Sequence, residues 1–303
     1  MGQRLAAVTA VLAAVALGLA GCSTAVPETA GPEGILATIT TPPSLLPSTP
    51  APRPAETSTS TAPADGWYLA LGDSLAAGMQ PDGDHKERGY AGPVLEGVRA
   101  KQPGTQLTNL GCSGETTTTM LRGGGCSYPE GSQIAAAVAF LKANADKTRL
   151  VTLDIGANNV LDCVKNGSLD QACATRDTTA AGKELGQIAG QIREAAPKVP
   201  IVLLTYYNPL LAAWQKGEQG KKFAAQSQPL LGGLNEEITK AAKSVGAKVA
   251  DVAGAFATND TGGSPRPNNV ARICDWTWMC SREDIHANDA GYAEMAKAVL
   301  AAR

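Results

Sequence analysis

Residues 66–77 read GWYLALGDSLAA, an apolar run that ends in glycine, aspartate and serine. The apolar part, residues 67–71, predicts a strand that is buried on both faces. Gly72 ends this strand, because glycine adopts tight backbone geometries without steric cost. The residues after Ser74 favour a helix, so we expect Ser74 on a strand-to-helix turn. The backbone N–H groups and the positive dipole end of that helix would then point at Ser74.

Four more short apolar runs follow, at residues 106–110, 149–153, 200–206 and 247–252. Helical patterns separate them, at residues 134–145, 178–195 and 230–245. A closing helix, capped by Asn288 or Asp289, is predicted by the helical spacing of Tyr292, Met295, Ala296, Val299 and Leu300. This alternation indicates an α/β fold: a three-layer α/β/α sandwich around a central, mostly parallel five-stranded sheet.

Polar motifs stand where the second and third strands end, and another precedes the closing helix. They are Ser113-Gly114-Glu115-Thr116, Gly156-Ala157-Asn158-Asn159 and Asp284-Ile285-His286. In open α/β sheets, ligands bind outside the carboxyl ends of the strands, where the first two motifs and Ser74 are expected. The chain has only two histidines, His85 and His286. Because His85 lies in a charged run, it is expected on a solvated loop, which leaves His286 as the candidate base for Ser74.

Ser74, Gly114, Asn158 and His286 follow the order of the four blocks of the SGNH (GDSL) hydrolase superfamily. The chain resembles this superfamily over about residues 66–303. The resemblance implies a flavodoxin-like sheet, Ser74 as nucleophile and His286 as base. It also implies an oxyanion hole formed by the backbone of Ser74 and Gly114 and the side chain of Asn158. The family usually has aspartate where this chain has Asn159.

The group that orients His286 has three candidates. The family pattern is Asp-x-x-His, but the residue three positions before His286 is Glu283, and Asp284 is two before it. We expect Glu283 to complete the catalytic set with Ser74 and His286, since glutamate can also orient an imidazole. The alternatives, in order of preference, are a backbone carbonyl and Asp284.

Seven cysteines occur, and one of them, Cys22, lies in a separate N-terminal context. The other six fall into neighbouring pairs, which predicts the disulfides Cys112–Cys126, Cys163–Cys173 and Cys274–Cys280. A zinc site is not expected, because the chain has no Cys-x-x-Cys motif. No metal or organic cofactor is implied.

The N-terminal part of the chain has the features of an export signal followed by a tether. Residues 1–21 carry one charge, Arg4, and an apolar run too short to span a bilayer as a helix, which predicts a signal peptide. Residues 19–22, LAGC, resemble a bacterial lipobox, so we expect lipidation at Cys22. Residues 22–65 are rich in Thr, Pro, Ser and Ala, and we expect a disordered tether before the hydrolase domain at 66–303.

Together these features predict an exported serine esterase with Ser74 as nucleophile and a preference for short acyl chains. It would be a monomer on the outer face of a bacterial membrane, anchored through Cys22, or secreted, acting on small-molecule, lipid or glycan esters. A formal net charge of −2, with no basic run, argues against nucleic acid as a partner. The alternatives are a polysaccharide or cell-envelope O-deacetylase and an inactive envelope binding lipoprotein of the same fold.

Overall fold

The computed structural model describes residues 65–165 and 167–303. The expected signal peptide, the lipidation site Cys22 and all of the 22–65 tether except Asp65 lie outside these residues. In the described part of the chain, no helix has both the length and the apolar character needed to cross a membrane.

A parallel five-stranded sheet forms the centre of the domain, with strand order β4-β1-β5-β8-β9. The strands span Gly66–Gly72 (β1), Thr105–Asn109 (β4), Thr148–Asp154 (β5), Ile201–Leu204 (β8) and Lys248–Ala250 (β9). β1 lies between β4 and β5, and its residues from Tyr68 to Leu71 are almost completely buried. All five predicted strands are therefore present, and their shared direction brings their carboxyl ends to one edge.

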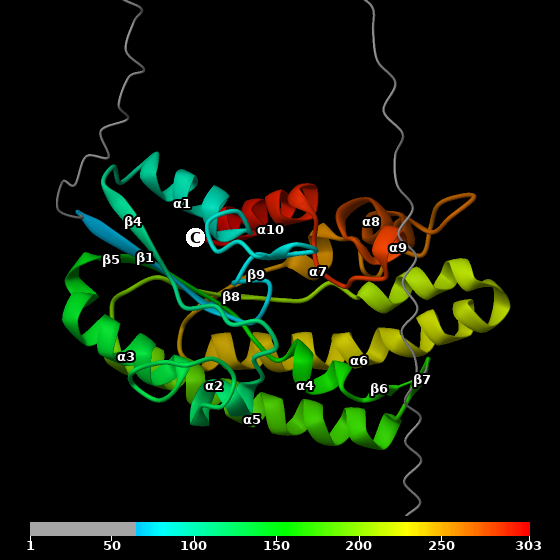
Figure 1. Ribbon diagram of the computed structural model, residues 1–303, viewed down its shortest axis with the longest axis horizontal. Coiled ribbons are helices and arrows are strands. Elements are labelled where there is room, and N and C mark those ends of the chain that lie inside the picture. The colour runs from blue at the N-terminus through cyan, green and yellow to red at the C-terminus, as the bar shows by residue number, and fades with distance from the viewer. Residues whose placement is uncertain (1–64, 166) are drawn as a thin grey trace, which may run out of the picture. The chain divides into compact units, whose positions relative to one another are not determined.

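Helices cover both faces of the sheet, which confirms the three-layer sandwich (Figure 1). One layer contains α1 (Ala91–Arg99) and the closing helix α10 (Asp289–Ala302). The opposite layer contains α3 (Gln133–Asn144), α5 (Gln171–Ala195) and α6 (Gly217–Ser244). Buried apolar side chains of α5 and α6 pack in this layer, among them Leu185, Ile188, Leu231, Leu234 and Ile238.

Short elements connect these layers. The helical ones are α2 (Thr117–Arg122), η1 (Ala145–Lys147), α4 (Ala157–Leu161), η2 (Pro209–Lys216), α7 (Val252–Ala255), α8 (Asn268–Trp276) and α9 (Met279–Arg282). Two antiparallel hairpins pair β2 (Met79–Gln80) with β3 (Gly83–Asp84) and β6 (Val164–Lys165) with β7 (Ser168–Leu169).

Several element boundaries differ from the sequence prediction. The helix expected at 230–245 begins at Gly217, because Pro229 is accommodated inside α6 rather than ending it. The strand expected at 200–206 ends at Leu204. After it, the Tyr206 N–H turns away from the sheet and donates to Asn235 Oδ1 at 2.7 Å. The tyrosine side chains that follow β8 therefore enter the region at the carboxyl edge.

Candidate active site

Ser74 lies on a tight turn directly after β1. Gly72 has φ +146°, and a Cβ there would meet the carbonyl oxygen of Asp154 at 2.2 Å, so the end of β1 requires glycine. The Ala77 N–H donates to Asp73 O and the Met79 N–H to Ser74 O, at 3.0 and 2.9 Å. These bonds close a single turn that leads into β2. The expected helix after Ser74 is therefore absent, since Gly78 (φ +68°) reverses the chain, and the helix-dipole argument does not apply.

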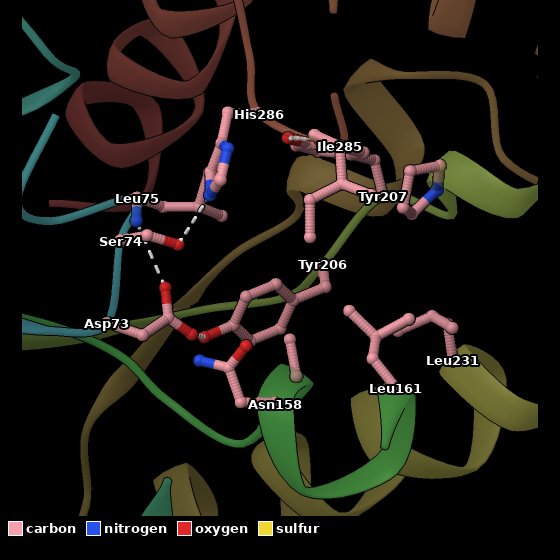
Figure 2. A pocket seen from close by; sticks show the side chains of 12 residues that line it. Asp73, Ser74, Leu75, Asn158, Leu161, Tyr206, Tyr207, Leu231, Ile285 and His286 are labelled. Carbon is pink, nitrogen blue, oxygen red and sulfur yellow. Dashed lines mark hydrogen bonds between the residues drawn. The ribbon is translucent and has the colours of Figure 1, made fainter. Parts of the chain in front are cut away.

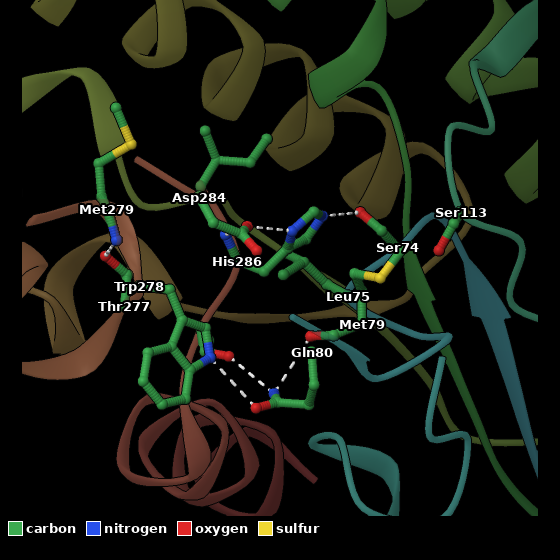
Figure 3. Close-up of polar contacts among 12 residues, drawn as sticks. Ser74, Leu75, Met79, Gln80, Ser113, Thr277, Trp278, Met279, Asp284 and His286 are labelled. Atoms are coloured by element: carbon green, nitrogen blue, oxygen red, sulfur yellow. Dashed lines mark hydrogen bonds and ion pairs between the residues drawn. The ribbon is translucent and has the colours of Figure 1, made fainter. Parts of the chain in front are cut away.

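His286 contacts Ser74 across the domain. Its Nε2 lies 2.9 Å from Ser74 Oγ, and its Nδ1 lies 2.5 Å from Asp284 Oδ1 (Figure 3). The same carboxylate oxygen accepts the backbone N–H of His286 at 3.0 Å. Ser74 is 7% exposed, so the hydroxyl, the imidazole and the carboxylate form a continuous, largely buried hydrogen-bonded series.

The structure corrects the expected partner of the imidazole. Glu283 has a left-handed backbone (φ 55°) at the end of α9, and its side chain is 76% exposed. Its carboxylate pairs with Lys216 Nζ at 2.8 Å, and this ammonium group lowers the pKa of Glu283. The chain turns at Glu283, so the carboxylate that reaches Nδ1 is that of Asp284, the least favoured of the three candidates.

Contacts from three other parts of the chain hold the loop that carries His286. The Trp278 N–H donates to His286 O at 3.0 Å, and the Trp278 indole donates to Gln80 Oε1 at 3.1 Å. The Gln80 amide donates in turn to Ala287 O at 3.0 Å (Figure 3). The Tyr207 hydroxyl donates to Ile285 O at 2.8 Å. Main-chain atoms on both sides of the imidazole are thus bound to buried or half-buried side chains.

The three expected oxyanion donors lie at the carboxyl edge: Ser74 on the turn after β1, Gly114 on the loop after β4 and Asn158 in the first turn of α4. In the described part of the chain, neither the Ser74 nor the Gly114 backbone N–H donates to another protein atom. Gly114 has φ +80°, and the space where its Cβ would lie is open. The Asn158 amide donates one hydrogen bond to Glu115 O at 2.8 Å, which links its position to the Gly114 loop. The second N–H of that amide is available for a ligand.

Asn159, where the family usually has aspartate, also holds this region together. Its Oδ1 accepts the Thr117 N–H at 3.0 Å, and its amide donates to Thr117 Oγ1 at 2.9 Å. The loop that contains Gly114 is therefore tied to α4 through two neighbouring asparagines. The carboxylate that contacts this segment comes from α5 instead, since Glu184 Oε2 accepts the Thr117 hydroxyl at 2.6 Å.

A family model for the GDSL-like lipase/acylhydrolase family matches residues 70–294. The chain belongs to this family. No curated protein of known function matches the chain. Solved structures with the same fold include an extracellular lipase from Streptomyces rimosus, 20% identical, with a TM-score of 0.54 over 78% of this chain and 100% of that one. Phospholipase A1 from Streptomyces albidoflavus NA297 is 21% identical, with a TM-score of 0.52 over 79% and 100%.

The cavity at Ser74 of this GDSL-family hydrolase is small, about 30 Å³ (Figure 2). Ser74, His286 and Asn158 form its polar side, and Leu161, Leu231, Pro209 and Ile285 contribute apolar surface. A second cavity of about 620 Å³ is lined by residues that neighbour these along the chain, including Val164, Leu210 and Glu283. Its rim includes the Lys216–Glu283 ion pair, so it combines apolar walls with polar groups.

The three predicted disulfides are confirmed in this GDSL-family domain: Cys112–Cys126, Cys163–Cys173 and Cys274–Cys280. The first closes the loop that contains Gly114. The third joins α8 to α9, immediately before the loop of His286. Two of the three bridges therefore restrain segments of the candidate site.

Consecutive tyrosines, Tyr206 and Tyr207, are site residues that the sequence pattern did not reveal. The Tyr206 hydroxyl donates to Asp73 Oδ2 at 2.6 Å, next to Ser74, whereas the Tyr207 hydroxyl donates to Ile285 O, next to His286. The available signal was their position at the end of the fourth apolar run, but the run predicted a strand through Tyr206. Each tyrosine fixes one side of the Ser74–His286 pair.

Asp284→Asn is expected to lower kcat by about 10³-fold or more, because a neutral amide cannot stabilise the imidazolium formed during the reaction. Glu283→Gln is the matched control and should stay within about twofold of the wild type, since it removes only an exposed ion pair. Steady-state kinetics on a chromogenic ester measures both. A larger loss in Glu283→Gln than in Asp284→Asn would contradict this assignment.

Proposed function

We propose that this protein is a serine carboxylester hydrolase in which Ser74, His286 and Asp284 form the catalytic triad. The series Asp284–His286–Ser74, with contacts of 2.5 and 2.9 Å, is the observation that carries this proposal. An imidazole at this distance from a serine hydroxyl can accept its proton as the hydroxyl attacks an ester carbonyl. Family membership supports ester hydrolysis as the reaction class.

The reaction passes through an acyl-enzyme. As the Ser74 Oγ–C bond forms, the proton moves to His286 Nε2 and the carbonyl oxygen becomes an oxyanion. The N–H groups of Ser74, Gly114 and Asn158 stabilise this charge, each donor contributing about 2.7–4 kcal/mol to transition-state stabilisation. His286 then gives the proton to the leaving alcohol, and water releases the acid by the reverse sequence. Asp284 keeps Nδ1 protonated and stabilises the imidazolium.

The small cavity supports a preference for short acyl groups, because about 30 Å³ beside Ser74 holds few methylene groups. The cavity of about 620 Å³, lined by residues close along the chain to those at Ser74, would take a larger alcohol half of the ester. This combination also favours the alternative of an O-deacetylase, in which an acetyl group enters the small cavity and the sugar remains in the larger one. Activity on acetylated polysaccharide compared with simple acetate esters distinguishes the two.

We also propose that the enzyme is exported and held at the outer face of a bacterial membrane through a lipid on Cys22. The lipobox-like sequence before Cys22 supports this location. Three disulfides in the domain support an oxidising compartment.

A fluorophosphonate reagent should modify the purified domain at Ser74 alone, because it reacts with an activated serine in an oxyanion hole. Ser74→Ala should abolish both labelling and ester turnover, and His286→Ala should reduce them by about 10³-fold or more while the fold is retained. Mass spectrometry and circular dichroism provide the readouts. Full turnover by Ser74→Ala would end the serine-hydrolase proposal, and an unlabelled wild type would favour the binding protein.

Acetyl and butyryl esters of p-nitrophenol should have a kcat/KM at least about tenfold higher than the palmitoyl ester, because each methylene that the cavity cannot hold reduces binding in the transition state. Initial rates, measured at substrate concentrations below the critical micelle concentration of the palmitoyl ester, give this ratio. Faster turnover of palmitoyl than of butyryl esters would refute the short-chain preference.

Expression of the full chain in a bacterial host with a labelled fatty acid should give a labelled protein in the membrane fraction. Cys22→Ser should remove the label and release the enzyme, because serine lacks the thiol to which the lipid is attached. An unlabelled wild-type protein that fractionates with the medium would contradict the anchor.

A further inference from the structure

Two carboxyl groups, Asp73 and Asp154, are buried directly beneath the nucleophile turn. Asp73 is 1% exposed and Asp154, the last residue of β5, is not exposed at all. Neither takes part in an ion pair within the described residues. Two adjacent carboxylates without a cationic partner are costly in a low-dielectric interior, so one of them is expected to keep its proton.

Both carboxyl groups hold the backbone on the two sides of Ser74. Asp154 Oδ2 accepts the Ala76 N–H at 3.2 Å and a longer bond, at 3.4 Å, from the Asp73 N–H, which also donates to the backbone oxygen of Asp154 at 3.0 Å. Asp73 Oδ1 accepts the Leu75 N–H at 3.0 Å. Every N–H from Asp73 to Ala76 except that of Ser74, the oxyanion donor, is therefore bound by this pair. The carboxyl groups fix the turn and leave the functional N–H free.

The remaining carboxyl oxygens bind tyrosine hydroxyls. Tyr206 donates to Asp73 Oδ2 at 2.6 Å, and Tyr90 donates to Asp154 Oδ1. The titratable groups that face the pair from the surrounding elements are Tyr68, Tyr90, Tyr206, Tyr207, Tyr292, Asp284 and His286. Burial raises the pKa of each of these tyrosines, so they remain neutral hydroxyl donors. Glu115, also buried, reaches the same strand end through Gln133, whose amide bonds Gly72 O.

We propose that Asp73 and Asp154 share one proton between them, and that Asp154 positions Ser74. Asp154 is a positioning residue: its carboxyl group touches the nucleophile turn and not the substrate. This role rests on the proposed esterase function of Ser74. The pair carries a single negative charge, which the Tyr206 and Tyr90 hydroxyls and the N–H groups of Leu75 and Ala76 stabilise.

The electrostatics agree with this assignment. Burial, followed by the negative charge of Asp73, raises the pKa of Asp154 well above its ordinary value. Burial also raises the pKa of Asp73, which the hydrogen bond from Tyr206 opposes. Between the ordinary carboxyl pKa of 3.8 and the raised value, the folded protein binds a proton that the unfolded chain lacks. The contribution of this pair to the stability of the wild type therefore falls as the pH rises through this interval.

Asp154→Asn is the deciding variant, because its amide keeps the size, the neutral charge and both an acceptor and a donor. Its kcat should stay within about threefold of the wild type, whereas Asp154→Leu should lose about 10–100-fold in kcat with little change in KM, because it leaves the Ala76 N–H unpaired and removes one of the two partners of the Tyr90 hydroxyl. Asp146→Asn, at an exposed position, is the control for removing one carboxylate. Equal losses in Asp154→Asn and Asp154→Leu would show that the ionised carboxylate is required and would overturn the proposal.

Thermal unfolding between pH 4 and 9 provides a second readout that does not depend on activity. The Tm of Asp154→Asn relative to the wild type should rise with pH, since only the wild type holds a proton that high pH removes. A constant or falling difference would overturn the shared proton. If Ser74 proved inactive, the unfolding measurement would still decide whether the Asp73–Asp154 pair holds a proton. The failure of the esterase proposal and the failure of the shared-proton proposal therefore remain distinguishable.

Discussion

Parallel pairing of β1 with β4 on one side and β5 on the other is the constraint on which the site depends. It brings the ends of three strands together, so that Ser74, the loop of Gly114 and the first turn of α4 meet at one edge. The register pairs Gly72 with Asp154, the two residues that close the central strands. A glycine is required at the first position because the backbone oxygen and the buried carboxyl group of the second fill the space of a Cβ.

The histidine reaches this edge from a different direction. His286 precedes α10, which packs on the opposite face of the sheet from α5 and α6 (Figure 1). Within the described residues its loop belongs to no strand of the sheet, and side chains hold it together with an isolated antiparallel bridge between Thr277 and Ala287. Gln80 and Tyr207 bind its carbonyls, and Trp278 binds it through the backbone. The Cys274–Cys280 disulfide restrains the segment before it. The imidazole is therefore positioned by tertiary contacts.

This difference explains what the sequence could predict. The continuous apolar runs predicted the strands. The motifs at their ends predicted that Ser74, Gly114 and Asn158 lie at one edge, because strand direction alone brings these positions together. The partner of His286 could not be read in the same way. Glu283 and Asp284 are adjacent, and only the left-handed backbone at Glu283 decides which carboxylate faces Nδ1 and which faces Lys216. The number of residues between two positions in the sequence does not predict the φ angle of a residue between them.

The prediction of a helix after Ser74 was wrong for a related reason. The absence of this helix changes which groups can hold the backbone around Ser74. Without that helix, no macrodipole supports the oxyanion, and the N–H groups around Ser74 need partners from elsewhere. The buried carboxyl groups of Asp73 and Asp154 provide them, which ties the precision of the nucleophile to polar groups inside the core. Such groups produce no periodic pattern in the sequence, because a single aspartate at the end of an apolar run predicts only a turn. Buried carboxyl groups at strand ends are therefore the features that a pattern-based reading of this fold is most prone to miss.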